Sequence, residues 1–508
     1  MRKRILFMLI PLLLFYGLPI GAVEKEDRSW QDESIYYITI DRFNNGDFTI
    51  DYSVDAEDPE RYHGGDFEGI KIRLDYIKDM GFTAIGLSSI LDNEDNGYHG
   101  YWTKDFYKTE EHFGSIENFN ELVKEAHKRD MKVIVDLSVN HVGPNHPWLS
   151  ESDKKDWFHP ELEITNEDNE EQREKGWLAG LPDLAHENPE VSKYLIDAAK
   201  WWIEETDIDG YRLEAVEYVP VSFWQDFSSE IKEVKDDFLL LGDIRSKEDA
   251  VIKKYQEARL DGFFDYASNG ELRSAFSKPD QTLNKASQIM EKNSKTYQNP
   301  FLLTTFMDNQ HTHRFTRDTV VLNEHPGPRW KLGLTYLFTT PGIPFVYYGS
   351  EIALDGGEEP DNQRQMDFRT DKELIDYVTS IAKVRNQYPS LTRGSYELLH
   401  EEGGFLVYKR EYNGETTVVA LNNTTKSQSV TLTAEELEDN MELRGVLNGD
   451  LVRSDEGKYP VILDRDEAEI YLLAEKTGLN IPFIAGTASV VVLFLAFIFL
   501  LKRKAKKA

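Results

Sequence analysis

The sequence predicts an α/β protein whose main domain is a (β/α)8 barrel. Eight short apolar runs, rich in β-branched and aromatic residues, recur along the 508-residue chain, and amphipathic stretches separate them. Such near-continuous apolar runs are typical of parallel strands that are covered on both faces by helices. Polar residues suited to chemistry follow several of the runs, and ligand sites of this fold lie at the carboxyl ends of its strands.

The predicted barrel covers residues 30–140 and 189–389. Its eight strands are expected at residues 35–40, 82–87, 132–136, 210–213, 238–241, 262–265, 301–306 and 344–348. Helices are expected between them, for example at residues 118–129, 191–205 and 221–234, where apolar side chains recur with a helical period.

Two further units are attached to the barrel. Residues 141–188, inserted after the third strand, are rich in Asp, Glu, Asn and Trp. Because long excursions inside a compact domain are usually functional or structured, we expect a small subdomain there. After Pro389 the pattern changes to short alternating runs split by Asn-Gly and Gly-Gly, which predicts a C-terminal antiparallel β-sandwich domain over residues 390–473.

Both ends of the chain carry patterns of membrane targeting. Residues 1–22 combine basic residues, an apolar run and a terminal Gly-Ala, which predicts a signal peptide, with an uncleaved anchor as the alternative. Residues 481–501 contain no charged side chain and suit a bilayer-crossing helix, the alternative being a buried core helix. The basic residues 502–508 should remain cytoplasmic. We therefore expect a single-pass protein of the cell membrane, with an extracellular body and a C-terminal helix in the lipid bilayer.

The composition restricts the class of ligand. The formal net charge of −33 argues against a nucleic-acid partner, whose phosphates would be repelled. The chain has no cysteine, which excludes disulfides and thiolate metal ligands. An acidic, soluble body is compatible with neutral ligands such as sugars. The aromatic content of 12% suits either a large core or platforms for sugar stacking.

Four segments at predicted strand ends carry the most specific motifs. They are Val-Asp-Leu-Ser-Val-Asn-His at 135–141, Gly-Tyr-Arg-Leu-Glu at 210–214, Leu-Leu-Gly-Asp at 240–243 and Phe-Met-Asp-Asn-Gln-His at 306–311. In order and spacing they resemble the four sequence regions of the α-amylase family, glycoside hydrolase family 13. The resemblance extends over residues 34–473 and implies an α-glucan, such as starch or a maltooligosaccharide, as the ligand.

The resemblance also identifies three candidate catalytic positions. The family uses an Asp nucleophile, a Glu general acid/base and a second Asp that stabilises the transition state, and here these positions hold Glu214, Asp243 and His311. A retaining glycosidase needs its two carboxyl groups about 5–5.5 Å apart. One position gains a methylene and the other loses one, shifts on the order of 1.5 Å each, and misplacement by about 1 Å can cost ~100-fold in rate.

Other positions match the sugar-binding residues of the family. The loop Gly-Tyr-His-Gly-Tyr-Trp at 97–102 resembles the loop at the cleavage subsite, so we expect Tyr98 to stack under a sugar ring and His99 to bond a hydroxyl. Core packing around Trp102 is the alternative. The remaining expected substrate-binding residues are Asp136, His141, Arg212 and Gln310, the last of which stands where the family has His.

The resemblance implies calcium as the cofactor, at two sites. Clustered hard oxygen ligands on Gly-containing loops suit Ca²⁺. The residues carried over to the first site are Asn45, Asp47, Asp51, Gly64 (through its carbonyl) and Asp66. A turn-rich loop of solvated acids is the alternative. The second site, between barrel and inserted subdomain, would comprise Asn140, Asp183 and the carbonyl of Tyr218.

Three functional interpretations follow from this sequence. The preferred one is an α-glucan-binding protein whose hydrolysis is lost or very weak, because His311 replaces an acid and an imidazolium would oppose an oxocarbenium-like state. The second is an active retaining α-1,4-glucan hydrolase or transglycosylase with an altered triad. The third is a membrane-tethered scaffold without sugar affinity.

Overall fold

The computed structural model of the protein describes residues 28–246, 248–370, 372–476, 489–490 and 492–499. The expected signal peptide at 1–22, the basic tail at 502–508 and most of the expected membrane span at 481–501 lie outside the described residues. Within the described part, no helix is both long and apolar enough to cross a membrane.

Eight parallel strands form a closed barrel, which confirms the predicted fold. The strand order is β8-β7-β6-β5-β2-β1-β10-β9, and a parallel bridge between Phe264 and Thr304 joins the two ends. The strands are β1 (Ile35–Ile38), β2 (Ala84–Leu87), β5 (Lys132–Ser138), β6 (Gly210–Glu214), β7 (Leu239–Gly242), β8 (Gly262–Phe263), β9 (Thr304–Phe306) and β10 (Ile343–Tyr347). Every residue of β1, β2, β6, β7, β9 and β10 is buried, as expected for strands covered on both faces.

The barrel is least extensively paired around β8. Strands β5 and β6 pair at five positions, whereas β7 and β8 pair at two and β8 meets β9 only through the bridge from Phe264. The strand expected at 301–306 begins only at Thr304, because Pro300–Leu302 forms a 3-10 helix, η8. Proline has no amide hydrogen to donate to a neighbouring strand, which favours this turn.

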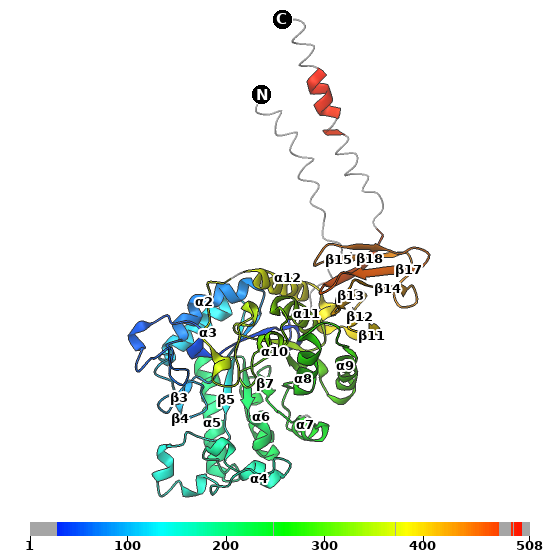
Figure 1. Ribbon diagram of the computed structural model, residues 1–508. Helices are drawn as coiled ribbons and strands as arrows, with labels where there is room; N and C mark the ends of the chain where they lie inside the picture. The colour runs from blue at the N-terminus through cyan, green and yellow to red at the C-terminus, as the bar shows by residue number, and fades with distance from the viewer. Residues whose placement is uncertain (1–27, 247, 371, 477–488, 491, 500–508) are drawn as a thin grey trace, which may run out of the picture.

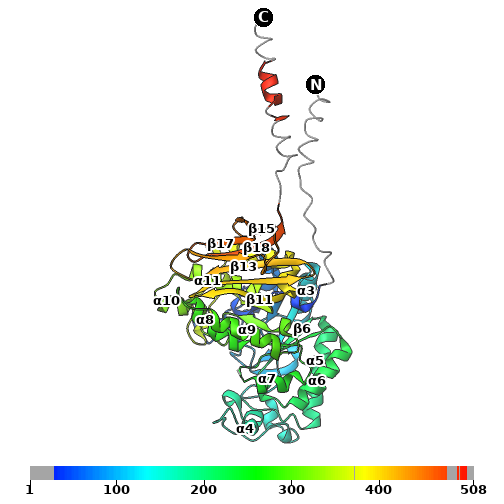
Figure 2. The ribbon, with the colours of Figure 1, turned by 90° about the vertical axis from the view of Figure 1, so that its right-hand side faces the viewer.

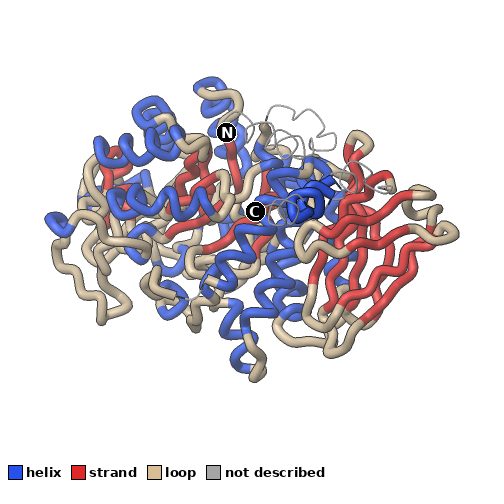
Figure 3. The backbone as a smooth tube through the Cα atoms, turned by 90° about the horizontal axis from the view of Figure 1, so that it is seen from above, coloured by secondary structure: helices blue, strands red, loops and turns tan. Residues whose placement is uncertain are grey.

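Helices surround the barrel (Figures 1 and 3). Helix α3 is representative: Ser115 caps its first turn and Phe119, Leu122, Val123 and Ala126 form its buried face. The helices are α2 (Phe67–Asp79), α3 (Ile116–Lys128), α5 (Pro189–Thr206), α6 (Val221–Val234), α7 (Asp249–Gln256), α8 (Tyr266–Phe276), α9 (Asn284–Thr296), α10 (Phe315–Val321), α11 (Pro326–Thr339), α12 (Glu373–Gln387) and α13 (Pro389–Arg393).

Two excursions shape the face at the carboxyl ends of the strands. A hairpin of β3 (Leu91–Asn93) and β4 (Thr103–Thr109) presents the loop at 94–102. The segment 141–188 contains the short helix α4 (Glu170–Lys175) and 3-10 turns, and isolated bridges link its two ends. One of these bridges joins His141 to Asp183.

The C-terminal β-sheet domain packs at the end of the molecule opposite α4 (Figures 1 and 2). One sheet contains β11 (Ser395–Glu402), β12 (Phe405–Tyr412), β13 (Glu415–Asn422), β18 (Ala468–Glu475), β15 (Met441–Gly445) and β16 (Leu451–Arg453), and β14 (Gln428–Thr433) pairs with β17 (Lys458–Leu463). A second apolar core, including Val407, Val418 and Val461, lies between these strands. On the barrel side, the Tyr408 hydroxyl hydrogen-bonds to Thr339 of α11.

Candidate active site

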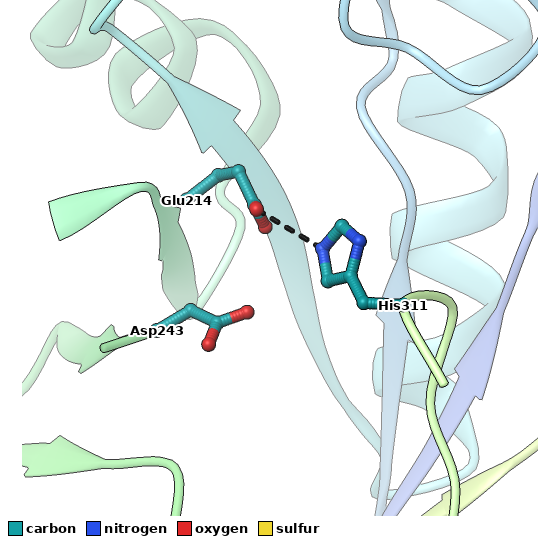
Figure 4. Close-up of side chains that lie close together, drawn as sticks. All are labelled: Glu214, Asp243 and His311. Atoms are coloured by element: carbon teal, nitrogen blue, oxygen red, sulfur yellow. Dashed lines mark ion pairs between the residues drawn. The ribbon is translucent and has the colours of Figure 1, made fainter. Parts of the chain in front are cut away.

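The three candidate catalytic side chains converge at the carboxyl ends of their strands. Glu214 ends β6, Asp243 follows β7 and His311 lies in the loop after β9 (Figure 4). One ligand atom from each lies within 4.8 Å of the others. Elsewhere in the described chain, no other three His, Asp or Glu side chains converge this closely. The distant sequence regions thus build one cluster.

Arg212, in β6, is buried at the centre of this cluster and contacts three acids. Its Nη1 lies 2.7 Å from Asp136 Oδ2 and 2.8 Å from Glu214 Oε2, and its Nη2 is ion-paired with Asp243 Oδ2. Burial acts to lower the pKa of Arg212, but the three carboxylates outweigh it and hold that pKa well above its ordinary value. The Arg212 guanidinium therefore forms an ion pair with one carboxylate oxygen of each of three acids.

The other oxygen of Glu214 is engaged as well. Oε1 lies 3.0 Å from His311 Nε2 and 3.2 Å from Arg245 Nη2. Burial acts to raise the pKa of Glu214, but the charges of His311 and Arg212 outweigh it, so the pKa lies well below its usual range. Glu214 is thus a carboxylate surrounded by nitrogen donors.

Two other carboxyls close to the cluster have raised pKa values. Burial raises the pKa of Asp136 to about 7, and its Oδ2 accepts a 2.5 Å hydrogen bond from the Tyr37 hydroxyl. Burial, reinforced by the charge of Asp243, raises the pKa of Glu217 to about 7. Glu217 Oε1 accepts the backbone N–H of Arg245. Neither acid occupies the family's proton-donor position.

The loop at 94–102 forms an aromatic wall beside the cluster. His99 stacks on Tyr101 with ring centroids 5.3 Å apart and meets the edge of Trp102 at 4.9 Å. Tyr98 is buried, and the Arg42 guanidinium covers one face of its ring at 3.9 Å. Only the opposite face of Tyr98 remains for a ligand, so its predicted stacking role is restricted to that side.

His141, at the start of the inserted segment, completes the wall. Burial lowers its pKa to about 4, so the ring is neutral near pH 7. Nδ1–H donates to Asn140 Oδ1 at 3.0 Å, and Nε2 is buried without a hydrogen-bond partner in the described part of the chain. His99, with a pKa lowered by burial to about 4, is also neutral.

Three residues of the site escaped the sequence prediction. Tyr101 packs parallel to the His311 ring, with centroids 5.7 Å apart, and its hydroxyl lies 3.4 Å from His311 Nε2. Arg245 and Glu217 approach from the loops after β7 and β6. Of the three, only Tyr101 could have been found from the sequence, because it lies in the aromatic loop that resembles the cleavage subsite.

Gln310, a predicted sugar contact, is buried. Its amide oxygen lies 2.6 and 2.8 Å from the Arg212 guanidinium nitrogens when it faces the guanidinium.

The residues of the first expected calcium site are only partly convergent. Asn45 Nδ2 lies 3.0 Å from Asp51, and a Cβ on Gly64 would come within 2.6 Å of Asn45. Asn45 Oδ1 is buried and has no hydrogen-bond partner in the protein. Asp47 instead bonds Thr49, and Asp66 caps α2 while accepting the N–H groups of residues 46 and 47.

The residues of the second expected site meet around one amide. Asn140 Nδ2 donates to Asp183 Oδ1 at 2.9 Å and to the Tyr218 carbonyl at 3.1 Å. His159, which the sequence did not suggest, occupies the other Asp183 oxygen at 2.6 Å. Burial raises the pKa of Asp183 to about 7, although the bonds from His159 and Asn140 oppose the shift.

Comparisons with known proteins agree with this architecture. The catalytic domain of α-amylases matches residues 37–386, and the α-amylase C-terminal domain matches residues 394–471. A crystal structure of an Anoxybacillus α-amylase is 57% identical, with a TM-score of 0.88, and the alignment covers 89% of this chain and 100% of that one. The Geobacillus thermoleovorans α-amylase, solved in complex with acarbose, is 53% identical, with a TM-score of 0.87 over 89% of this chain and 100% of that one.

A longer relative shares only part of its length with this chain. The β/α-amylase of Paenibacillus polymyxa is 33% identical over 480 residues, which are 90% of this chain but 39% of that protein. The matched catalytic domain covers more than half of the 508 residues, and the strand-end motifs lie inside it. By fold, domain order and site position, this chain belongs to the α-amylase family.

Proposed function

We propose that this protein binds α-glucans at the carboxyl-end face of the barrel and has lost, or nearly lost, their hydrolysis. The observation that carries the proposal is the contact of His311 Nε2 with Glu214 Oε1 at 3.0 Å. It occupies the oxygen that a nucleophile would need, and it brings an imidazole to the place where the family has an acid.

The spacing of the two carboxyl groups is not the obstacle. One oxygen of Glu214 lies within 4.8 Å of one oxygen of Asp243, which is near the separation of about 5–5.5 Å typical of retaining enzymes. The obstacle is the charge around Glu214. Arg212, Arg245 and His311 contact its two oxygens, and each such contact stabilises the carboxylate relative to a covalent glycosyl ester.

The expected proton-donor position is also altered. The general acid of a glycosidase must carry a proton near neutral pH, which requires a raised pKa. Asp243, one methylene shorter than the Glu of the family, is ion-paired with Arg212. Burial raises the pKa of the neighbouring Asp136 and Glu217 to about 7, but these two acids stand at other positions, and Asp136 Oδ2 accepts hydrogen bonds from Arg212 and Tyr37.

The wall of the pocket supports sugar binding. The rings of His99, Tyr101 and Trp102 pack against one another, and their partly exposed surface suits the C–H face of a sugar. His141 Nε2 and Asp136 Oδ1 are buried polar atoms without protein partners, which ligand hydroxyls could satisfy. The acarbose complex of the Geobacillus thermoleovorans relative favours the same class of ligand.

The test measures binding and hydrolysis in the same preparation. We expect maltoheptaose to bind in calorimetric titration while product chromatography detects no cleavage after prolonged incubation. Turnover within the usual enzyme range of about 1–10³ s⁻¹, abolished by Glu214→Gln, would establish the active hydrolase or transglycosylase instead. Absence of binding to maltoheptaose and to longer glucans would favour the scaffold without sugar affinity.

We also propose that calcium binds the first loop. The backbone of Gly64 lies close to the side chains of Asn45 and Asp51, and Asn45 Oδ1 is buried without a hydrogen-bond partner among the described residues. Amide and carboxylate oxygens of this kind suit Ca²⁺. Bound calcium would fix this loop against the start of α2, where Asp66 caps the helix. The set at Asn140, Asp183 and Tyr218 is the second candidate for the same ion.

For localisation, we propose an extracellular body held at the cell membrane by residues 481–501. The support is the sequence pattern of an uncharged apolar segment followed by a basic one. Protease added outside intact cells should digest the barrel and leave a fragment containing residues 502–508. Release of the full-length chain into the medium would contradict the proposal.

A further inference from the structure

We propose that Glu214, Asp243 and His311 form a binding site for a divalent transition-metal ion of the Zn²⁺ class. Nothing in the glucan-binding function requires such an ion. The inference rests on the donor atoms that these three side chains bring together, and on how Arg212 divides the oxygens among them.

The donor atoms are close enough to share one ion. Glu214 Oε1 and His311 Nε2 are 3.0 Å apart, and the farthest pair in the cluster is within 4.8 Å. Two adjacent ligands at metal bond lengths of about 2.0–2.2 Å lie roughly 3–3.5 Å from each other. Figure 4 shows the Asp243 carboxylate directed toward the space beside Glu214 and His311, so a small side-chain rotation completes a three-ligand set.

Arg212 leaves one oxygen of each carboxylate for the ion. Its Nη1 binds Glu214 Oε2 and its Nη2 binds Asp243 Oδ2. Asp243 is 1% exposed, and its Oδ1 has no hydrogen-bond partner among the residues that the structure describes. A buried carboxylate oxygen without a partner is costly, and a cation would satisfy it. Arg212 would then act as the outer-shell partner that orients both ligating carboxylates.

The imidazole determines the class of ion. Calcium and magnesium prefer all-oxygen sites, whereas one imidazole with two carboxylates suits zinc and its neighbours among the transition metals. The Tyr101 ring packs beside His311, with centroids 5.7 Å apart and 25° between the ring planes. Among the described residues, the other ion pair of Glu214 Oε1 comes from Arg245, whose side chain is half exposed and can move into solvent.

The site is reachable from solvent. His311, Thr312 and His313 line an open hollow of about 600 Å³ on the surface of the barrel. His311 belongs both to this hollow and to the cluster, because its Nε2 contacts Glu214 Oε1. Three protein ligands would leave a coordination position for water, as in three-ligand zinc sites.

The experiment uses the full chain, purified and stripped of metal with a chelator. Zn²⁺ is titrated calorimetrically in a background of millimolar Ca²⁺, which saturates the oxygen-rich loops. We expect one Zn²⁺ per chain, and a loss of affinity of at least about 100-fold in His311→Gln and in Asp243→Asn, since both remove a direct ligand. His313→Gln, in the same hollow, is the matched control and should bind as the unmodified chain does.

A measurement on the unmodified chain protects the test against misfolded variants. Co²⁺ in place of Zn²⁺ should give a visible absorption spectrum with imidazole ligation, and equimolar Zn²⁺ should abolish it. Zinc binding that survives His311→Gln, that is lost equally in His313→Gln, or that Ca²⁺ displaces would overturn the proposal, as would no stoichiometric binding. Maltoheptaose binding is measured separately with chelator present, so failure of the metal site and failure of the glucan proposal remain distinguishable.

Discussion

The aromatic wall and the charged centre of the site lie next to each other, where Tyr101 meets His311, but differ in their chemistry. The wall, formed by Tyr98–Trp102 and His141, is aromatic and uncharged, and it presents a polar atom without a protein partner. The centre, formed by Glu214, Asp243 and His311, is joined by ion pairs to Arg212 and Arg245. Binding and reaction therefore depend on different residues, and one can be lost while the other remains.

The largest expected effect comes from rebuilding the centre alone. The triple variant Glu214→Asp, Asp243→Glu and His311→Asp should raise maltoheptaose hydrolysis by at least ~100-fold, because nucleophile reach, acid reach and sugar anchoring are corrected together. Each single change should do little, since residues that act as a unit are not additive. Product chromatography measures the rates, and Gln310→His can be added.

The triple variant also tests whether the aromatic wall and the charged centre are independent. Equal maltoheptaose affinity in the unmodified and triple-variant chains is the control. A triple variant that binds but remains inert, even with Gln310→His, would mean that the wall has changed along with the centre.

A second effect concerns the neutrality of the wall. The folded-state pKa of His141 is about 4, below the unfolded value of about 6.5. Between these values the unfolded chain binds the extra proton, so stability falls as pH is lowered from 6.5 toward 4. In His141→Asn, the loss of unfolding free energy between pH 7 and 4.5 should be smaller by on the order of 2 kcal/mol. Denaturant unfolding at both pH values tests this. The same loss of unfolding free energy in the variant and the unmodified chain would mean that His141 is in contact with water.

A smaller expected effect is the difference in maltoheptaose affinity between a variant of the aromatic wall and a variant of the charged centre. Trp102→Ala should weaken maltoheptaose affinity roughly tenfold, because it removes stacking surface. His311→Gln should change it by less than about threefold, since it keeps a polar group of similar reach. Phe48→Ala, an exposed aromatic outside the pocket, is the control. If His311→Gln weakens binding more than Trp102→Ala, the centre rather than the wall holds the glucan.

The smallest effect concerns calcium. Saturating Ca²⁺ should raise the melting temperature by about 2–4 °C through mass action, and Asp51→Ala should abolish this rise. Asp51 is a sharper choice than Asp66, whose carboxylate caps α2 and would destabilise the chain without any metal. Thermal scans with calcium or chelator decide the matter, and identical curves for the unmodified chain would exclude a stabilising site.

Much of this architecture was predictable because barrel strands are buried on both faces. Runs such as 84–87 and 343–347 are uniformly apolar, so burial alone marks them as strands. In strand β4 (Thr103–Thr109) only Thr103 and Phe106 are buried, and charged residues stand between and beyond them, so no continuous apolar run identifies it as a strand. Because η8 begins at a proline, the strand expected from residue 301 starts three residues later.

The residues of the site were predictable where the strand ends carry them. Arg245 was missed because its ion pair spans from the β7 loop to Glu214 in β6, and no local pattern reports a contact between separate strands. Likewise, His159 reaches Asp183 from 24 residues away, within an insertion that has little regular structure. Pairings of this kind depend on tertiary geometry rather than on composition or period.

The small number of backbone pairings around β8 has a consequence for local opening of the barrel. Asp243 follows β7 and His311 follows β9. The charged cluster therefore spans strand β8, which has the fewest pairings with its neighbours among the barrel strands. Local opening starts where few backbone hydrogen bonds must break. Amide hydrogens around Gly262–Phe263 should therefore exchange with deuterium sooner than those of β5 and β6, and the distance between Asp243 and His311 should fluctuate with that opening.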